Sequence, residues 1–254
     1  MESVFVEQLV NQWASLGHHC YVISPFSIIT FLRKHCAYGI YYERRFVNET
    51  AIDIYKPKII GFPGKIGNVA VSSFEAQYAI MRIVETINVK FDFVYCHFFI
   101  QGVRAFCFAQ KFNLPLFIAT GESTIPLIHK PSKDFSWSDF KKYVRGVICV
   151  SQKNKSEAIE RGYVDESKCV VIPNAVDTNT FHKMPRLKVR KEIGLSEKDF
   201  VIVCVGEFSE RKGQMRVIEA INRLPKKEHV KILLIGKMND TVCLYYIISC
   251  QWRQ

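Results

Sequence analysis

Short apolar runs alternate along this 254-residue chain with segments whose apolar residues recur at helical spacing. The apolar runs predict buried strands, and they lie at 20–24, 91–96, 116–120, 147–150 and 169–172. Strands that are apolar on both faces and alternate with helices are typical of a parallel sheet covered by helices on both sides. The pattern therefore predicts an α/β fold built on parallel strands.

Two segments show apolar residues at helical spacing. These residues are Phe5, Leu9, Trp13 and Leu16 in the first segment, and Phe74, Tyr78, Met81 and Val84 in the second. Residues three or four positions apart lie on one face of a helix. Each set is therefore predicted to form the apolar stripe of one helix.

A charged segment between Lys183 and Lys198 interrupts the alternation. After it a new unit begins with a predicted strand at 200–205, a polar loop, a helix and a second strand. We therefore predict one domain over residues 1–178, and a connector with an incomplete second domain over residues 179–254. A doubly wound domain opens with a strand and a phosphate-binding turn, whereas this chain opens on a helix. Both ends are interpreted as truncated, and the first strand as missing.

Basic residues outnumber acidic ones, 35 to 24, which gives a formal net charge of +11. Such an excess suits nucleic acid, an anionic membrane face or phosphorylated small molecules. The basic residues are scattered in pairs, and no long run interleaves them with aromatic residues. Most of them are interpreted as a solvated basic surface, and nucleic-acid binding is not favoured.

The cysteines and the apolar stretches bear on the compartment. The number of cysteines, nine, is odd, and no two form a C-x-x-C pair. This favours buried thiols in a reducing compartment over a disulfide framework or a zinc site. No apolar stretch is long enough to span a bilayer, and the start of the chain lacks the pattern of a secretory signal. We expect a cytoplasmic protein.

The segment from Val205 to Gly213 carries the clearest chemical signal. Gly206 directly follows a buried strand, so the backbone can turn sharply and approach a ligand closely. The next helix offers free amides and its positive dipole end to a phosphate, and Lys212 can reach the same place. An ordinary strand–helix loop with two exposed cations, Arg211 and Lys212, explains the pattern equally well.

Three longer stretches resemble a known family. They read VSQKNKSEAIERGYVDESKCVVIPNAVDTNTF, VIVCVGEFSERKGQMRVIEAI and KILLIGK. They resemble the middle of a retaining glycosyltransferase of family 4, also called group 1. The resemblance extends from the first helix to about Lys237. It implies a GT-B fold, in which two Rossmann-like domains face each other across a cleft, and a nucleotide-sugar donor with no metal cofactor.

The resemblance also implies roles for the loop after residue 205. Lys212 matches the lysine of the R-K-G motif that binds the donor diphosphate, and Gly206 matches the glycine that lets the backbone approach it. Glu207 stands where the family usually has an arginine, and Arg211 is a candidate to compensate. The family's paired glutamates, eight residues apart, would lie beyond the end of this chain.

On the acceptor side, Thr120 stands where many members have a histidine before a glycine, here Gly121, and Glu122 follows. His97 matches a histidine often found at the end of the preceding strand. His97 or Glu122 is expected to orient the acceptor hydroxyl or to accept its proton, and both are predicted as catalytic. A core histidine bonded to backbone is the alternative for His97.

The resemblance therefore implies an enzyme that moves a sugar from a nucleotide sugar to a glycan or lipid-linked acceptor, in polysaccharide biosynthesis. Basic surface on the acceptor domain would suit peripheral contact with the anionic inner face of a membrane. The alternative is a non-catalytic remnant or binding module that keeps the acceptor-domain fold. Neither interpretation requires nucleic acid.

Overall fold

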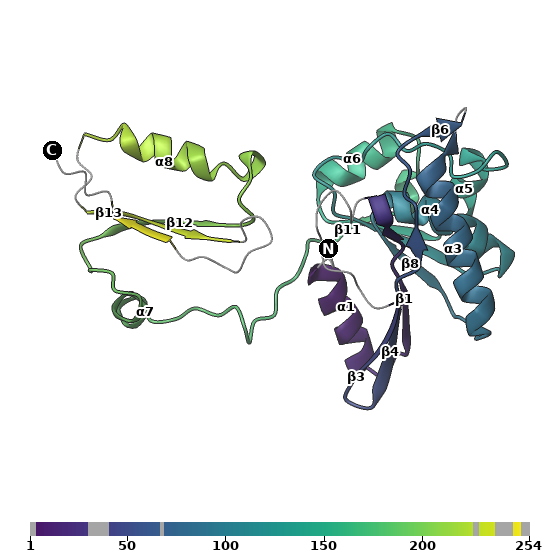
Figure 1. Cartoon of the computed structure of the whole chain (residues 1–254), viewed down its shortest axis with the longest axis horizontal. Coiled ribbons are helices and arrows are strands. Elements are labelled where there is room, and N and C mark those ends of the chain that lie inside the picture. Colours follow the sequence, from purple (N-terminus) through teal and green to yellow (C-terminus); the bar gives the residue numbers. More distant parts are fainter. Residues whose placement is uncertain (1–3, 30–40, 67–68, 226–228, 237–245, 250–254) are drawn as a thin grey trace. The chain divides into compact units, whose positions relative to one another are not determined.

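The computed structural model describes residues 4–29, 41–66, 69–225, 229–236 and 246–249 (Figure 1). The chain divides into two compact units, Met1–Ala175 and Val176–Gln254. The predicted domain boundary, after residue 178, lies close to this division. Each unit is described by itself.

A four-stranded parallel sheet forms the centre of the first unit. Its strands are β8 (Val94–His97), β9 (Leu116–Thr120), β10 (Gly146–Cys149) and β11 (Cys169–Val171), in the order β11-β10-β9-β8. All three pairings are parallel, as the apolar runs predicted. The helices that connect or follow these strands are α4 (Phe99–Lys111), α5 (Trp137–Tyr143) and α6 (Gln152–Glu160), and a short 3-10 helix, η1 (Glu166–Lys168), precedes β11.

The main hydrophobic core lies between this sheet and its helices. Its fully buried members include Phe99, Val103, Leu116, Ile118, Phe140 and Val147. Gly102 lets α4 approach the sheet closely, because a Cβ at this position would lie 2.4 Å from the Cδ1 atom of Ile118. The core therefore depends on a small residue on α4 as well as on large ones.

A second sheet joins β1 (Cys20–Ile23), β4 (Thr50–Tyr55) and β3 (Tyr42–Val47). β1 pairs with β4 in parallel, and β3 pairs with β4 as an antiparallel hairpin. The hairpin was not predicted, because its charged, alternating sequence lacks an apolar run. One face of this sheet packs on α1 (Val4–Ser15), where Val10, Ala14 and Ile52 are buried.

The other face of this sheet holds a completely buried carboxylate, Asp53. Asp53 accepts hydrogen bonds from Tyr42 Oη (2.6 Å) and from Arg44 Nε and Nη2 (2.7 and 3.0 Å). His19 Nε2 lies 2.7 Å from the same carboxylate. Burial alone would raise the pKa of Asp53, but the hydrogen bonds from Arg44, Tyr42 and His19 lower it to about 2. The carboxylate is therefore ionised and paired.

Within the described residues, β1 and β8 each pair with a strand along one edge only. Aromatic contacts join the two parts instead, because Trp13 of α1 packs edge-to-face on Tyr95 and Phe93, at ring-centroid distances of 5.0 and 6.2 Å. The described part of the chain thus contains no strand that links the two sheets.

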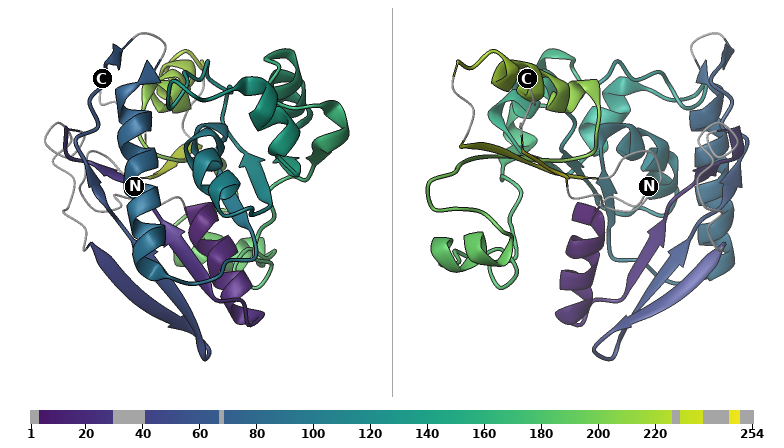
Figure 2. Two further views of the ribbon diagram at one scale, coloured as in Figure 1. Left: turned by 90° about the vertical axis from the view of Figure 1, so that its right-hand side faces the viewer. Right: turned by 60° about the vertical axis from the view of Figure 1, so that its left-hand side comes forward.

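Helix α3 (Val71–Ile87) buries a face that matches the predicted one only in part, at Val84 and Met81. Its buried residues are Ser73, Ala76, Ile80, Ile83 and Val84, whereas Phe74 and Tyr78 are exposed. The prediction was wrong for these two rings because it followed the spacing of large apolar residues and left out Ser73 and Ala76. Small side chains at Ser73 and Ala76 allow close packing, and α3 lies beside α4 (Figure 2).

Short strands precede α3. β2 (Phe26–Ser27) pairs in parallel with β5 (Lys58–Ile59), and β6 (Lys65–Ile66) pairs with β7 (Val69–Ala70) as an antiparallel hairpin. The residue that follows β7 begins α3, so this hairpin lies at the N-terminal end of the helix.

The second unit contains α7 (Arg186–Glu192), β12 (Phe200–Val205), a 3-10 helix η2 (Glu210–Lys212), α8 (Gln214–Asn222), β13 (Val230–Ile235) and β14 (Tyr246–Ser249). β12 and β13 are parallel, and β14 is antiparallel to β13. One face of β12 and β13 packs on α8 around Ile221, Ile232 and Leu234. Nowhere in the described residues does a helix combine the length and apolar character needed to cross a bilayer.

Candidate functional site

In the second unit the β12 loop, residues 206–213, brings together the residues predicted to bind a phosphate. Gly206 directly follows β12 with φ +147°, a conformation that favours glycine. Its amide donates to Ile235 O at 2.8 Å, which ties the loop to β13. A Cβ on Gly206 would lie 3.4–3.7 Å from methylene carbons of Lys212, so the Lys212 stem packs against this glycine.

Gln214, which the sequence analysis missed, holds this loop from inside. Its side chain is only 3% exposed. Its Nε2 atom donates to Gly206 O and Glu207 O at 3.3 and 3.0 Å, and its Oε1 atom accepts from the Ser209 amide at 3.4 Å. A glutamine at the start of a helix gives no signal in the sequence, because only the folded loop buries it.

The first residues of α8 point to anion binding at the same place. Gly213, the residue before the helix, has φ +76°, and no side chain caps the helix. Uncapped amides and the positive end of the helix dipole favour an anion. Arg216 also lies here, with its Nε atom 3.3 Å from where a Cβ of Gly213 would stand and its Nη2 atom donating to Glu210 O at 2.8 Å. Arg216 was not predicted.

The remaining charges of the loop are exposed. Arg211 and Lys212 both lie on η2 and reach solvent, as does Glu207. Within the described residues none of the three forms an ion pair. The loop therefore places Lys212 against Gly206 and Arg216 beside Gly213. Arg211 and Glu207 add exposed charges of opposite sign to the same loop.

In the first unit, His97 ends β8 and is half-buried. Its Nδ1 atom is buried and has no hydrogen-bond partner within the described residues. Its ring packs edge-to-face on Phe98 at 4.5 Å between centroids. Burial lowers the pKa of His97, which favours the neutral ring. The alternative was a core histidine bonded to backbone, and at Nδ1 no such hydrogen bond is formed within the described residues.

Glu122 connects two turns of the backbone. Its Oε1 atom accepts from the amide of Phe99 at 2.7 Å, and its Oε2 atom accepts from the amide of Gly121 at 2.9 Å. Phe98, which precedes α4, has φ +76° and gives the helix no side-chain cap. Glu122 therefore supplies the cap from another loop, with both of its oxygens engaged, and its catalytic role stays a prediction.

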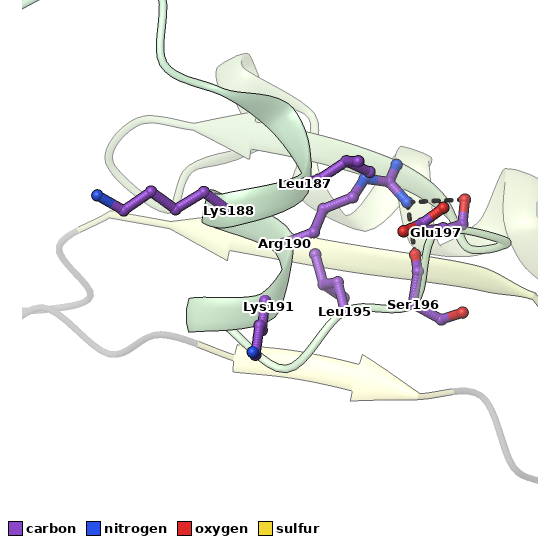
Figure 3. Close-up of a pocket in the computed structure, with 7 residues that line it drawn as sticks. All are labelled: Leu187, Lys188, Arg190, Lys191, Leu195, Ser196 and Glu197. Carbon is purple, nitrogen blue, oxygen red and sulfur yellow. Dashed lines mark hydrogen bonds between the residues drawn. The ribbon is translucent and has the colours of Figure 1, made fainter.

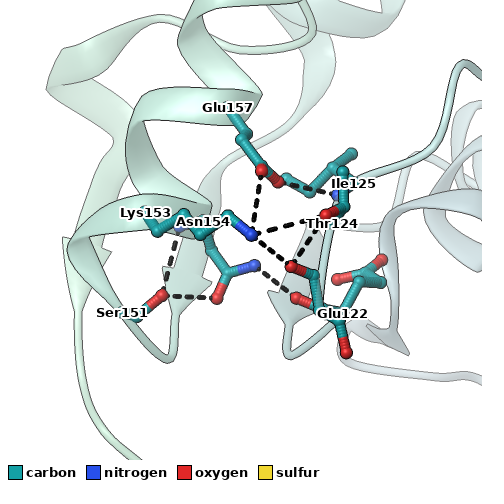
Figure 4. Close-up of polar contacts among 8 residues, drawn as sticks. Glu122, Thr124, Ile125, Ser151, Lys153, Asn154 and Glu157 are labelled. Atoms are coloured by element: carbon teal, nitrogen blue, oxygen red, sulfur yellow. Dashed lines mark hydrogen bonds and ion pairs between the residues drawn. The ribbon is translucent and has the colours of Figure 1, made fainter. Parts of the chain in front are cut away.

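The segment that contains Glu122 is the β9 loop, residues 121–125, and α6 holds it from the other side (Figure 4). Three α6 side chains bind its backbone: Asn154 Nδ2 donates to Glu122 O (2.8 Å), Lys153 Nζ donates to Ser123 O (2.6 Å), and Glu157 Oε2 accepts from the Ile125 amide (2.7 Å). The Ile125 hydrogen bond is the main reason why the pKa of Glu157 is lowered. The loop is thus fixed by polar contacts on two sides.

The structure does not bring Thr120 and His97 together. In the register of the sheet, His97 pairs with Ala119, whereas Thr120 pairs with Cys149. Because successive side chains of a strand point to opposite faces, the Thr120 hydroxyl and the His97 ring lie on opposite faces of the sheet. Thr120 is completely buried, and its Oγ1 atom has no partner within the described residues.

Gly121 is the second residue of the predicted acceptor-side pair. The backbone conformation at this position does not require a glycine. Its φ is not positive, and a Cβ there would have its nearest neighbour, Val150, at 3.8 Å.

A shallow pocket of ≈ 580 Å³ lies beside α7 in the second unit (Figure 3). Its lining comprises Leu187, Lys188, Arg190, Lys191, Leu195, Ser196 and Glu197. Arg190 Nη1 donates to the backbone oxygens of Ser196, Glu197 and Asp199, so this guanidinium holds the following loop. The pocket contains none of the predicted site residues.

No group of three or more His, Cys, Asp and Glu side chains in the described ranges is arranged to hold a metal ion.

Comparison with known proteins agrees with this architecture. A solved structure of Anabaena Alr3699/HepE in complex with UDP matches 93% of this chain and 58% of its own, with a TM-score of 0.57 and 19% identity. Sucrose-phosphate synthase from Thermosynechococcus elongatus matches 91% of this chain and 55% of its own, with a TM-score of 0.59 and 14% identity. The fold is that of the GT-B glycosyltransferases.

Matches to two protein-family models identify the family of this chain. The model "Glycosyltransferase Family 4" matches residues 3–180, and "Glycosyl transferases group 1" matches residues 185–249. The chain belongs to Glycosyltransferase Family 4.

Two curated relatives are also similar to this chain in sequence. An Escherichia coli protein, UDP-Gal:alpha-D-GlcNAc-diphosphoundecaprenol alpha-1,3-galactosyltransferase, is 28% identical over 142 residues, which are 52% of this chain and 36% of that protein. N-acetyl-alpha-D-glucosaminyl L-malate synthase of Bacillus anthracis is 21% identical over 241 residues, 90% of this chain and 56% of that protein. The chain thus spans between about a third and just over half of the length of these relatives.

Proposed function

We propose that the protein represented by this chain transfers a sugar from a nucleotide-sugar donor to a glycan or lipid-linked acceptor, in polysaccharide biosynthesis. The observation that carries the proposal is the geometry of the β12 loop. Gly206, the Lys212 stem and the uncapped start of α8 lie together, and Gln214 holds the loop from inside.

This geometry suits the negative charge of a donor diphosphate. When a glycosyl bond to a nucleotide breaks, charge develops on the leaving diphosphate, and preorganised donors stabilise it. Lys212 and the first amides of α8 would supply those donors, with Arg216 and Arg211 adding positive charge. Glu207 would oppose them. We propose that these side chains do the work without a metal ion.

The donor we propose is a UDP-sugar, with retention of configuration at the transferred carbon. The names of the relatives support this choice. The Escherichia coli relative is named for a UDP-Gal donor, and Anabaena HepE was solved with UDP.

The acceptor we propose is a lipid-linked sugar, since the same Escherichia coli relative is named for a diphosphoundecaprenol acceptor. We propose that the protein acts in the cytoplasm, at the inner face of the membrane. The β9 loop and His97 would face this acceptor. Burial lowers the pKa of His97, and the neutral ring would accept the proton of an acceptor hydroxyl through Nε2, because Nδ1 is buried.

Titration of UDP into the chain, followed by NMR of the backbone amides, tests the donor site. We expect the amide signals of Gly206 and Gly213 to shift, while that of Gly121 in the other unit serves as an internal control. UDP-dependent shifts confined to other residues would overturn the assignment of this loop. The absence of any shift would favour a module without donor binding.

A further inference from the structure

An exposed apolar surface lies at the N-terminal end of α3. Phe74 and Tyr78, one helical turn apart, are 53% and 60% exposed. Ile60 and Phe62, between β5 and β6, are 60% and 54% exposed, and Ile66, on β6, is 73% exposed. We call these five residues the α3 surface.

Backbone contacts hold the members of the α3 surface together. The amide of Gly61, between Ile60 and Phe62, donates to Glu75 Oε2 at 2.7 Å, and Glu75 is the neighbour of Phe74 on α3. The Val71 amide at the start of α3 donates to Gly64 O at 3.1 Å. The apolar residues of the loop and of the helix are therefore parts of one structured surface.

The α3 surface continues toward the β9 loop. The amide of Ala70, on β7, donates to Lys130 O at 3.1 Å, and Val69 forms a parallel bridge with Lys130. The segment that leads from the β9 loop to Lys130 exposes Leu127 to 70%. Backbone pairing at Lys130 thus connects the end of β7 beside the α3 surface with the segment that follows the β9 loop.

Positive charge accompanies these apolar side chains. Lys58 and Lys65 are exposed on β5 and β6, and Lys130 is half-buried beside β7. The nearby carboxylate of Glu75 is engaged with the Gly61 amide. The whole chain also carries a formal charge of +11. An anionic partner is therefore electrostatically complementary to this end of the first unit.

We propose that the α3 surface docks on an anionic lipid bilayer. Aromatic and aliphatic side chains that protrude beside lysines suit the boundary between lipid headgroups and acyl chains, where the rings insert and the ammonium groups meet lipid phosphates. A surface that binds a protein would instead have, at the centre of the interface, side chains that fit well-packed pockets. The inference rests on the proposed function, because the bilayer would be the membrane that carries the lipid-linked acceptor.

Vesicle co-sedimentation of the full chain tests this inference without any sugar nucleotide. The probes are vesicles of phosphatidylcholine alone and of phosphatidylcholine mixed with phosphatidylglycerol. We expect binding to the mixed vesicles, weakened by salt, and far weaker binding to phosphatidylcholine alone. The double variant Phe74→Gln/Tyr78→Gln keeps good helix formers on α3 and should lower vesicle affinity about tenfold or more. Lys65→Gln should lower it by about fivefold.

Phe46→Thr is the matched control. Phe46 is an equally exposed ring on β3, in the same unit but outside the α3 surface, and its replacement should leave vesicle binding unchanged. Circular dichroism of each variant would verify folding. Unchanged vesicle binding in the α3 double variant overturns the inference. Failure of the wild-type chain to co-sediment with either kind of vesicle overturns it as well. Self-association that the double variant abolishes, without vesicle binding, would assign the surface to a second copy. UDP binding, measured without lipid, is an independent readout, so failure of one proposal leaves the other standing.

Discussion

The carboxylate of Glu122 accepts a hydrogen bond from the amide of Phe99 at 2.7 Å, across 23 positions of sequence. This bond ties the loop after β9 to the first turn of α4, directly beside the strand end that carries His97. Because the preceding residue, Phe98, has φ +76° and no capping side chain, the bond also satisfies an amide that the helix leaves open. The position of the β9 loop is thus determined by a tertiary helix cap.

Replacing Glu122 by glutamine should destabilise the first unit by about 1–2 kcal/mol, the usual cost of losing a helix cap. Glutamine keeps one acceptor oxygen but places an amide group against the second backbone N–H. Urea denaturation measures the loss. Glu160→Gln, at an exposed site on α6, is the control and should leave the midpoint unchanged. Equal stability of the two variants would contradict the capping role.

Removing the Lys212 side chain should weaken UDP binding by about ten- to a hundredfold, the effect of losing a charge-assisted contact to phosphate. Isothermal titration calorimetry measures the affinity. Lys198→Ala, an exposed lysine of the same unit outside the β12 loop, should bind UDP like the wild type. If Lys212→Ala also does so, the loop is only a strand–helix connector.

Replacing Glu207 by arginine should strengthen UDP binding, since it removes a carboxylate that repels the diphosphate and adds a cation. The affinity should also depend more steeply on salt, because exposed charges are screened. Titrations at low and high ionic strength check both effects. An unchanged affinity would show that residue 207 does not face the phosphates.

Replacing Gln214 by methionine keeps the volume of the side chain but removes its three contacts with the β12 loop. The carbonyl groups of Gly206 and Glu207 would lose a buried partner, at a cost of about 1–3 kcal/mol. We expect a lower melting temperature and weaker UDP binding. Gln152→Met is the control, because Gln152 also begins a helix but is exposed. Wild-type UDP affinity in Gln214→Met would show that the loop keeps its shape without this clamp.

Asp53 should make stability depend on pH in the acidic range. Its pKa in the folded protein is lowered to about 2, so its ion pair with Arg44 stabilises the fold above the ordinary aspartate pKa of about 3.9. This stabilisation is lost as the pH falls from there through about 2. The difference in urea midpoint between wild type and Asp53→Asn should therefore be largest at neutral pH and shrink toward pH 2. Asp92→Asn, at an exposed aspartate, should show no such difference, and a pH-independent gap for Asp53→Asn would contradict the assignment.

The strands of the parallel sheets were predictable because each is a local property of the sequence. Runs such as 116–120 and 200–205 are short and apolar, and they form β9 and β12. The hairpin of β3 and β4 was not predictable in this way, since its charges alternate and its stability comes from Asp53 and from packing on α1. The buried face of α3 was also misjudged, because packing selected Ala76 over the larger ring of Tyr78.

The candidate sites divide along the same line. The glycine after β12 and the lysine of the R-K-G sequence are visible as a pattern, and the fold places Gly206 and Lys212 in contact. The clamp by Gln214, the cap by Glu122 and the separation of Thr120 from His97 are not visible, since each depends on strand register or on contacts between distant segments.

The sequence by itself determined the α/β class, the family and the glycine-containing loop after β12, because these depend on residue types at fixed local spacing. Only the tertiary structure decided which polar groups are buried and what they bind. A buried donor or acceptor must find a partner, and the partner's identity depends on the segment that the fold brings within hydrogen-bonding distance. For Glu122 that segment is the start of α4, and for Gln214 it is the turn at Gly206.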